Sequence, residues 1–393
     1  MLFKIFIFIL ICCYYNLYLT KVINYISNEK EVYWNNEKIN ISSIKEEIIN
    51  YENISITSIS SLNLKKYEEI NNPKISLIIP IYNNQKNIIN CYLSICNQSL
   101  KDIEIIFIND ASKDNSSNII EELMLIDKRI ILLNNETNKR EFNSKKKGAL
   151  KAKGEYIYII NPNDLLLNNI LEKAYNTAKN YNLDILQFYI MIGNYKTNRI
   201  RKSLKYKSGI FNYSKIKNIL YNCYSPSLKD KIIKREIFIN SLKFTGEYYN
   251  NDIYDYSDDD LIIFGLSNAA KSYGFLEVVG YFYYVRYPWF SMDPNYRVKQ
   301  IDLIFSKLFN ITKFFFETTK NNREEKFFAY KFFYNKIYIY RNKLFHLTQN
   351  FDYINDILNQ FLYSRFYYIK EKERIQKFQN ELLIIKSKNK NII

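Results

Sequence analysis

The sequence predicts an α/β fold in which helices flank a mostly parallel sheet. The first observation is a short apolar run from Ile75 to Ile79, rich in β-branched residues and closed by Pro80. A second run of this kind extends from Ile103 to Ile108, and between the two Asn87 to Cys96 places apolar residues at helical spacing. Short apolar runs are typical of strands buried on both faces. A strand, a helix and a second strand in succession therefore predict a parallel pair.

Polar residues follow both of these strands. The first run passes into Tyr82 and Asn83, and the second ends in the stretch Asp110 to Asp114. In an open parallel sheet the carboxyl ends of the strands border the ligand crevice. We therefore expect Pro80 to Asn83 and Asp110 to Asp114 to share one site.

The alternation of helices and strands continues along the chain. Helices are expected at Ser116 to Asp127, Ser144 to Lys153 with Gly154 as its C-cap, Leu165 to Asn180 and Ser257 to Tyr273. Strands are expected at Arg129 to Leu133, Tyr156 to Ile160, Asp184 to Met191 and Phe275 to Arg286. The basic stretch Arg199 to Lys207 is expected to leave the sheet.

Composition excludes several kinds of chemistry. The 393 residues include 56 Lys and Arg against 40 Asp and Glu, a formal charge of +16 that suits an anionic partner such as a nucleotide diphosphate. Much of this charge reflects a chain rich in Lys, Asn, Ile and Tyr, and no nucleic-acid fingerprint is present. The single histidine, His346, argues against Ser-His-Asp triads and multi-histidine zinc sites. The five cysteines form no disulfide framework.

Three ordered motifs carry a family resemblance. The stretches "ISLIIPIYN", "NQSLKDIEIIFINDASKDNS" and "KGEYIYIINPNDLL" resemble the nucleotide-sugar-binding half of family 2 glycosyltransferases, over roughly Pro73 to Trp289. The resemblance implies the Rossmann-like GT-A fold and a nucleotide-sugar donor, with UDP as the expected nucleotide. It places nucleotide contacts at Pro80, Tyr82, Asn83, Asp110 and Ser112. Asp110 could accept a hydrogen bond from a uracil imide, or it could only close a strand through an Asx-type turn.

The expected metal site departs from the family pattern. The resemblance implies an Asp-x-Asp sequence that holds Mn²⁺ or Mg²⁺ on the diphosphate, but this chain has Asn161, Pro162, Asn163 and Asp164. Hard cations prefer carboxylate oxygen, and an amide oxygen is a weaker ligand. Asn163 and Asp164 are the remaining metal-ligand candidates. Lysines such as Lys145, Lys146 and Lys147 could replace the metal charge at the diphosphate.

The acidic triplet Asp258 to Asp260 supplies the catalytic candidates. It resembles the Glu-Asp pair whose Asp is the general base of an inverting, single-displacement transfer to a glycan or glycoprotein acceptor. Alignment backward from "NAAKSYGFL" favours Asp259 as this base, and a one-residue shift gives Asp260. The alternative is a purely structural role, in which the carboxylates stabilise the N-terminus of a helix. Like charge is expected to raise the pKa of the base. The competing functional hypothesis is a catalytically inactive glycosyltransferase-like binding module.

The N-terminal segment predicts a membrane attachment. Residues 1–20 are strongly apolar and read as a signal anchor or a signal peptide, with no small-residue cleavage site before Lys21. Residues 21–72 are expected to form a stem, 73–300 the GT-A domain and 301–393 a helical extension. An anchor would make this a single-pass membrane protein of the endoplasmic reticulum or Golgi with a lumenal catalytic domain, and a cleaved segment would make it secreted.

Overall fold

A computed structural model describes the central part of the chain. The described residues are 33–34, 37–38, 65–167, 169–193, 198–201, 209–212, 216, 220, 227–246 and 258–284. The predicted anchor, most of the predicted stem and the predicted C-terminal extension lie outside this set. Among the residues that the structure describes, no helix has the length and apolar content needed to cross a membrane. The short strands β1 (Tyr33–Trp34) and β2 (Glu37–Lys38) pair with each other in antiparallel fashion.

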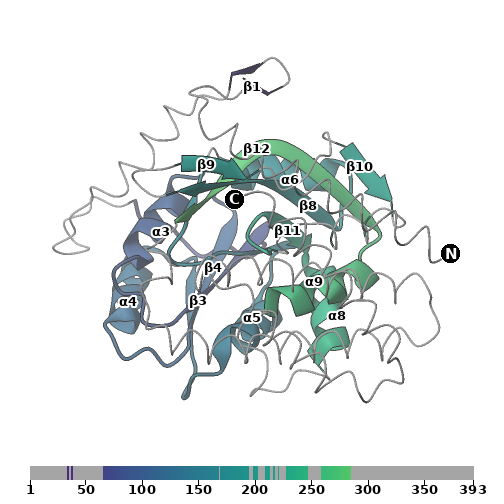
Figure 1. The fold of residues 1–393 in the computed structure, drawn as a ribbon. Coiled ribbons are helices and arrows are strands. Elements are labelled where there is room, and N and C mark those ends of the chain that lie inside the picture. The colour runs from purple at the N-terminus through teal and green to yellow at the C-terminus, as the bar shows by residue number, and fades with distance from the viewer. Residues whose placement is uncertain are drawn as a thin grey trace, which may run out of the picture. The chain divides into compact units, whose positions relative to one another are not determined.

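Within the described residues the domain is built on a ten-stranded sheet (Figure 1). Its strands are β3 (Ile75–Ile81), β4 (Ile103–Asn109), β5 (Ile130–Asn134), β6 (Tyr156–Ile159), β7 (Leu165–Leu166), β8 (Ile185–Gly193), β9 (Asn198–Arg201), β10 (Gly209–Asn212), β11 (Lys231–Lys234) and β12 (Ser272–Tyr284). They lie in the order β10-β12-β8-β11-β6-β3-β4-β5, with β7 on β12 and β9 on β8. Strands β6, β3, β4 and β5 are parallel, whereas β11 is antiparallel to both of its neighbours. The predicted α/β class is confirmed, and the sheet is parallel on the side of the three motifs and mixed elsewhere.

Helices cover both faces of the parallel part. The described helices are α3 (Ile88–Cys96), α4 (Ser116–Ile126), α5 (Arg140–Lys151), α6 (Ile170–Asn180), α8 (Arg235–Gly246) and α9 (Asp258–Ala269). Leu77 and Ile79 of β3 belong to the core shared with α3 and α4. Ile78, between these two residues, points to the opposite face and packs against Gly148 of α5. A Cβ added at Gly148 would lie 2.7 Å from the Ile78 side chain. Helices α5, α8 and α9 lie together in Figure 1. Successive residues of β3 are therefore buried on opposite faces, as its apolar run predicts.

Tertiary contacts correct several predicted element boundaries. Helix α5 begins at Arg140, four residues before the predicted start at Ser144. It ends in an extended residue, Ala152, so Gly154 is not its C-cap. Gly154 lies against β3 instead, where an added Cβ would be 2.5 Å from the Ser76 backbone nitrogen. A glycine is required there by close packing rather than by helix termination.

Strand pairing accounts for further corrections. The predicted helix Ser257 to Tyr273 ends at Ala269, because Ser272 and Tyr273 belong to β12. Leu165 and Leu166, predicted as the start of a helix, form β7 against β12. Arg199 to Arg201 pair with β8 as part of β9 rather than leaving the sheet. Strand β3 also continues through Pro80 to Ile81, because β6 pairs with it only as far as Ile78. A proline is tolerated where a strand lacks a neighbour on one side.

Candidate active site

The loops that follow β3 and β4 are joined by reciprocal hydrogen bonds. The backbone N–H of Asn83 donates to the Ser112 Oγ at 3.1 Å, and the Asn83 Oδ1 accepts from the backbone N–H of Lys113 at 2.9 Å. The backbone N–H of Gln85 donates to the Asp114 carboxylate at 3.0 Å. The predicted proximity of these two loops is confirmed. They form one surface at the carboxyl ends of the parallel strands.

Three of the five described non-glycine residues with a positive φ angle lie in these loops or at the start of α5. Asn83, Ala111 and Arg140 have positive φ angles of 51°, 58° and 69°. Such a conformation costs a non-glycine residue about 1 to 3 kcal/mol and is often retained at functional sites. Tyr82, between the end of β3 and Asn83, is 46% exposed and is available to a ligand.

Asp110 is a buried carboxylate that holds the start of α5. Its Oδ1 accepts from the Asn135 Nδ2 and from the backbone N–H of Lys139, both at 2.7 Å. Its Oδ2 accepts from the backbone N–H of Arg140 at 2.8 Å. This long-range cap satisfies donors at the helix N-terminus and explains why α5 starts earlier than its sequence predicts. The Oδ2 accepts one of the two hydrogen bonds that a carboxylate oxygen can accept, so it has room for one further donor.

Asp259 lies in the first turn of α9 and is bound by a lysine of α5. The Lys145 Nζ is 2.5 Å from the Asp259 Oδ1 and 2.8 Å from a Glu141 carboxylate oxygen. The Lys145 side chain is 1% exposed and that of Asp259 is 23% exposed. Lys145 therefore holds the carboxylate from inside the domain, and its neighbour Lys146 is half-buried. The side chain of Asp260 is buried, which leaves Asp259 as the more accessible of these two catalytic candidates.

The charge environment of Asp259 differs from the sequence prediction. Burial raises the pKa of the Asp259 carboxyl, but the charges of Lys145 and Lys229 and the hydrogen bonds from Lys145 and the Leu228 N–H outweigh it. The pKa of Asp259 consequently lies below its ordinary value, and the predicted rise caused by like charge is wrong. Its nearest charged partners are lysines, and a carboxylate so placed is ionised at neutral pH.

Asp164 follows β6 and is held by groups that do not resemble a metal site. Its carboxylate accepts a hydrogen bond from the Tyr281 hydroxyl at 2.7 Å and another from the Tyr284 backbone N–H at 3.1 Å. The Lys229 Nζ lies 3.7 Å from its Oδ2. The other candidate ligand, Asn163, accepts from the Asn87 side chain at 2.9 Å.

These contacts test whether Asn163 and Asp164 fit a divalent cation. A cation at Asp164 would lie beside the ammonium of Lys229, and the amide oxygen of Asn163 is already engaged by Asn87. Over the described ranges, no cluster of three or more His, Cys, Asp or Glu side chains is placed to hold a metal ion. The arrangement of these two residues therefore does not fit a divalent cation.

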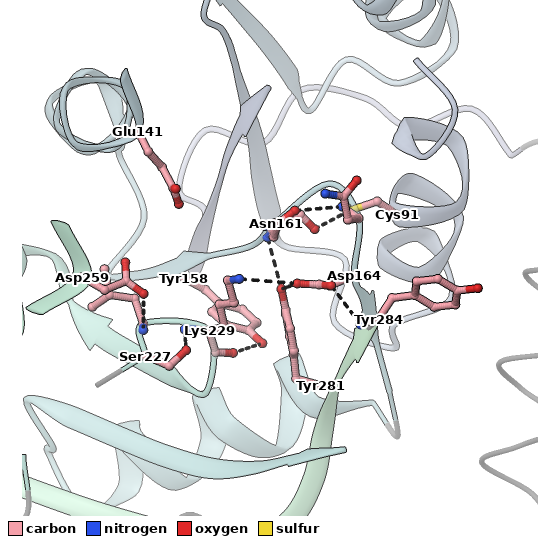
Figure 2. Close-up of polar contacts among 12 residues, drawn as sticks. Cys91, Glu141, Tyr158, Asn161, Asp164, Ser227, Lys229, Asp259, Tyr281 and Tyr284 are labelled. Carbon is pink, nitrogen blue, oxygen red and sulfur yellow. Dashed lines mark hydrogen bonds and ion pairs between the residues drawn. The ribbon is translucent and has the colours of Figure 1, made fainter. Parts of the chain in front are cut away.

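A segment without a distinguishing sequence motif, Leu228 and Lys229, links the two carboxylates. The backbone N–H of Leu228 donates to the Asp259 Oδ2 at 3.3 Å, and the next residue, Lys229, contacts Asp164. The Tyr158 hydroxyl of β6 donates to the Lys229 carbonyl at 2.9 Å. Figure 2 shows Lys229 between Asp259 and Asp164. In the sequence this lysine is one of several charged residues before a short apolar run, and no motif distinguishes it.

Comparisons with known proteins agree with this fold. Residues 76–242 match the model of the family described as "Glycosyl transferase family 2". The chain is 36% identical to the glycosyltransferase GlyG of Streptococcus pneumoniae over 121 residues. This match covers 31% of the chain and 38% of GlyG. It is 33% identical to the cholesterol galactosyltransferase of Borreliella burgdorferi over 184 residues. This match covers 43% of the chain and 50% of that protein. The chain thus spans half or less of the length of these two relatives.

Solved structures show the same architecture. S. aureus TarS 1–349 in complex with UDP has a TM-score of 0.56 at 17% sequence identity, over 77% of this chain and 82% of that one. The complex of TarS with UDP-GlcNAc has a TM-score of 0.55 at 18% identity, over 74% of this chain and 80% of that one. This likeness concerns the fold. The family match, with the three sequence motifs and the parallel β6-β3-β4-β5 half-sheet, identifies residues 76–242 as a glycosyl transferase family 2 domain, which has the GT-A fold.

Proposed function

We propose that this chain is a glycosyltransferase that moves a sugar from a UDP-sugar to a hydroxyl group of a glycan or glycoprotein acceptor. The observation that carries the proposal is the position of Asp259, a partly exposed and ionised carboxylate bound by Lys145 of α5, the helix whose start is held by Asp110 in the loop after β4. The names of the relatives GlyG and cholesterol galactosyltransferase support a transferase activity. The TarS complexes with UDP and UDP-GlcNAc support the choice of donor. An anchor at residues 1–20 would attach the domain to a membrane of the endoplasmic reticulum or Golgi.

The proposed reaction is an inverting single displacement. The acceptor oxygen forms a bond to the anomeric carbon while the bond from that carbon to the diphosphate oxygen breaks. Asp259 accepts the proton of the acceptor hydroxyl, and UDP leaves with the electron pair. Because Lys145 occupies the Oδ1 of Asp259, the Oδ2, which has only the 3.3 Å contact to the Leu228 N–H among the contacts described here, is the proposed proton acceptor.

A specific observation favours the alternative of an inactive binding module. A carboxylate whose pKa is lowered by two lysines is a weaker base than one near neutral pH, and the Asp-x-Asp pattern is replaced by Asn161 and Asn163. Such a protein would retain UDP binding through the loops after β3 and β4. The two functions differ in turnover and not in nucleotide affinity.

Asp259→Asn and Asp260→Asn test the proposal together. With the full chain, UDP release from UDP-GlcNAc and other UDP-sugars would be measured with a panel of glycan acceptors, and UDP affinity by calorimetry. Asp259→Asn is expected to lower turnover by about 10² to 10⁴-fold with little change in UDP affinity. A matching loss only in Asp260→Asn would move the base to that residue. UDP binding without turnover in the wild type would favour the inactive module.

A further inference from the structure

The ammonium of Lys229 lies beside Asp164, one of the two side chains to which the family resemblance assigns a metal. It lies 3.7 Å from the Oδ2 of Asp164, which is longer than a hydrogen bond, so this pair is a charge contact that leaves the donors of the ammonium available. The Nζ also lies 4.8 Å from the ring centre of Tyr283, within the range of a cation–π contact. A positive charge is thus held in place at the end of β6 by side chains of the domain itself.

The relative exposure of the pair determines which charge a ligand meets. The Asp164 side chain is 1% exposed and is directed to the Tyr281 hydroxyl and the Tyr284 N–H, whereas the Lys229 side chain is 17% exposed. An anion that approaches this edge of the sheet therefore meets the ammonium, with the carboxylate behind it. A second carboxylate, Asp259, lies close enough for Lys229 to lower its pKa. The lysine accordingly lies between the proposed base and the turn after β6.

The backbone around Lys229 is fixed by the same strand that leads into that turn. The Tyr158 hydroxyl of β6 donates to the Lys229 carbonyl, and the Lys229 N–H donates to the Ser227 Oγ at 3.2 Å. The Tyr281 hydroxyl, which donates to Asp164, also accepts from the Asn161 N–H at 3.2 Å. A charge positioned in advance stabilises a developing anion without reorganisation of the site.

We propose that Lys229 takes the place of the divalent metal and neutralises the diphosphate of the nucleotide sugar and of the departing UDP. The inference rests on the proposed function. As the bond between the anomeric carbon and the β-phosphate oxygen breaks, the electron pair goes to that oxygen, and the ammonium of Lys229 faces the charge that forms there. Proton transfer to Asp259 is a separate event of the same step. Donor binding and transfer by this chain are therefore independent of Mn²⁺ and Mg²⁺.

The test compares the binding of UDP and uridine to the full chain by calorimetry, in EDTA and in Mn²⁺. The variants are Lys229→Met, Lys229→Arg and the control Lys234→Met, which alters the far end of β11, where the Lys234 Nζ is 3.4 Å from Glu236. Wild type is expected to bind UDP equally in EDTA and in Mn²⁺. Lys229→Met is expected to weaken UDP binding by about 10 to 100-fold and to leave uridine binding unchanged, because only UDP carries the diphosphate. Lys229→Arg keeps the charge and should retain most of the affinity.

The outcomes separate this inference from the proposed function. UDP binding that requires Mn²⁺, or equal UDP affinity in Lys229→Met and wild type, would overturn the role of Lys229 while the transferase proposal stands. Failure of the wild type to bind either UDP or uridine would overturn the choice of donor and this inference with it. Equal losses of uridine and UDP affinity in Lys229→Met would mean a damaged fold rather than a lost charge, and would count against the inference unless Lys229→Arg restores UDP binding alone.

Discussion

The main effect of replacing Asp110 by Asn should be a lower free energy of unfolding of the domain, rather than the loss of a contact with the nucleotide. The carboxylate is 4% exposed and accepts hydrogen bonds from the Asn135 amide and the backbone N–H groups of Lys139 and Arg140. An asparagine has one acceptor oxygen, so its NH₂ group would face at least one of these donors. A hydrogen bond to a charged group contributes about 1.5 to 3 kcal/mol, and one buried donor would also lose its partner at a cost of about 1 to 3 kcal/mol. The free energy of unfolding should fall by roughly 2 to 5 kcal/mol, since these costs overlap.

Urea unfolding followed by circular dichroism measures this change, and Ser112→Ala is the matched control. The Ser112 hydroxyl accepts only one described backbone hydrogen bond at an exposed position, so its loss should cost about 1 kcal/mol or less. The m-value should be unchanged in both variants if the loss occurs in the native state. An Asp110→Asn protein that unfolds like the wild type but binds UDP more weakly would refute the reasoning. Asp110 would then serve the uracil ring rather than the start of α5.

Three further predictions follow from buried contacts. Gly154→Ala should lower the free energy of unfolding by about 1 to 3 kcal/mol in urea, because its Cβ would lie 2.5 Å from a backbone nitrogen of β3; wild-type stability would disprove this close packing. Asp127→Asn should cost about 3 to 5 kcal/mol, because it leaves the buried Arg129, now bound at 2.7 Å, without its countercharge; a Tm like that of the wild type would contradict this. Because the pKa of Asp259 is lowered, its contribution to stability should be present above the unfolded pKa of about 3.9 and disappear as the pH falls through the folded value. The acid limb of kcat/KM should likewise move to higher pH in Lys145→Met, where burial is no longer opposed by that lysine, and an unmoved limb would exclude Asp259 as the titrating base.

The parts of the fold that the sequence predicted depend on local patterns. The predicted apolar runs Ile75 to Ile79 and Ile103 to Ile108 lie within β3 and β4, and both are central parallel strands with buried side chains on each face. The pairing of β7 with β12 could not be predicted in this way, because the dipeptide Leu165-Leu166 fits a helix as well as a strand. The start of α5 at Arg140 depends on a carboxylate thirty residues earlier in the chain. Such boundaries are set by contacts that no local pattern contains.

The predictions for the site divide in the same way. Proximity of the loops after β3 and β4 follows from parallel topology, and the hydrogen bond between Asn83 and Ser112 confirms it. The assignments of nucleotide contacts and of Asp259 as the base stay predictions until a ligand or a variant is measured. The pKa of Asp259 could not be predicted, because the sequence shows two neighbouring aspartates and gives no sign that Lys145 lies 2.5 Å away. The predicted direction of the pKa shift is therefore wrong.

The loss of the Asp-x-Asp carboxylates and the presence of Lys229 are best understood as one change in charge. A site with Asp at positions 161 and 163 would place two more negative charges at the turn after β6, and a divalent cation would be needed to offset them before a diphosphate could bind. With Asn at both positions, Asp164 is the carboxylate that remains in that turn, and a single ammonium at 3.7 Å balances it. A metal then has little to bind, and the donor's charge is met by lysine. The double variant Asn161→Asp and Asn163→Asp, with Lys229 kept, should accordingly bind UDP more weakly in EDTA, because it adds negative charge beside the proposed diphosphate position. Recovery of that binding with Mn²⁺ would show that the metal and the lysine are alternatives at one place in the fold.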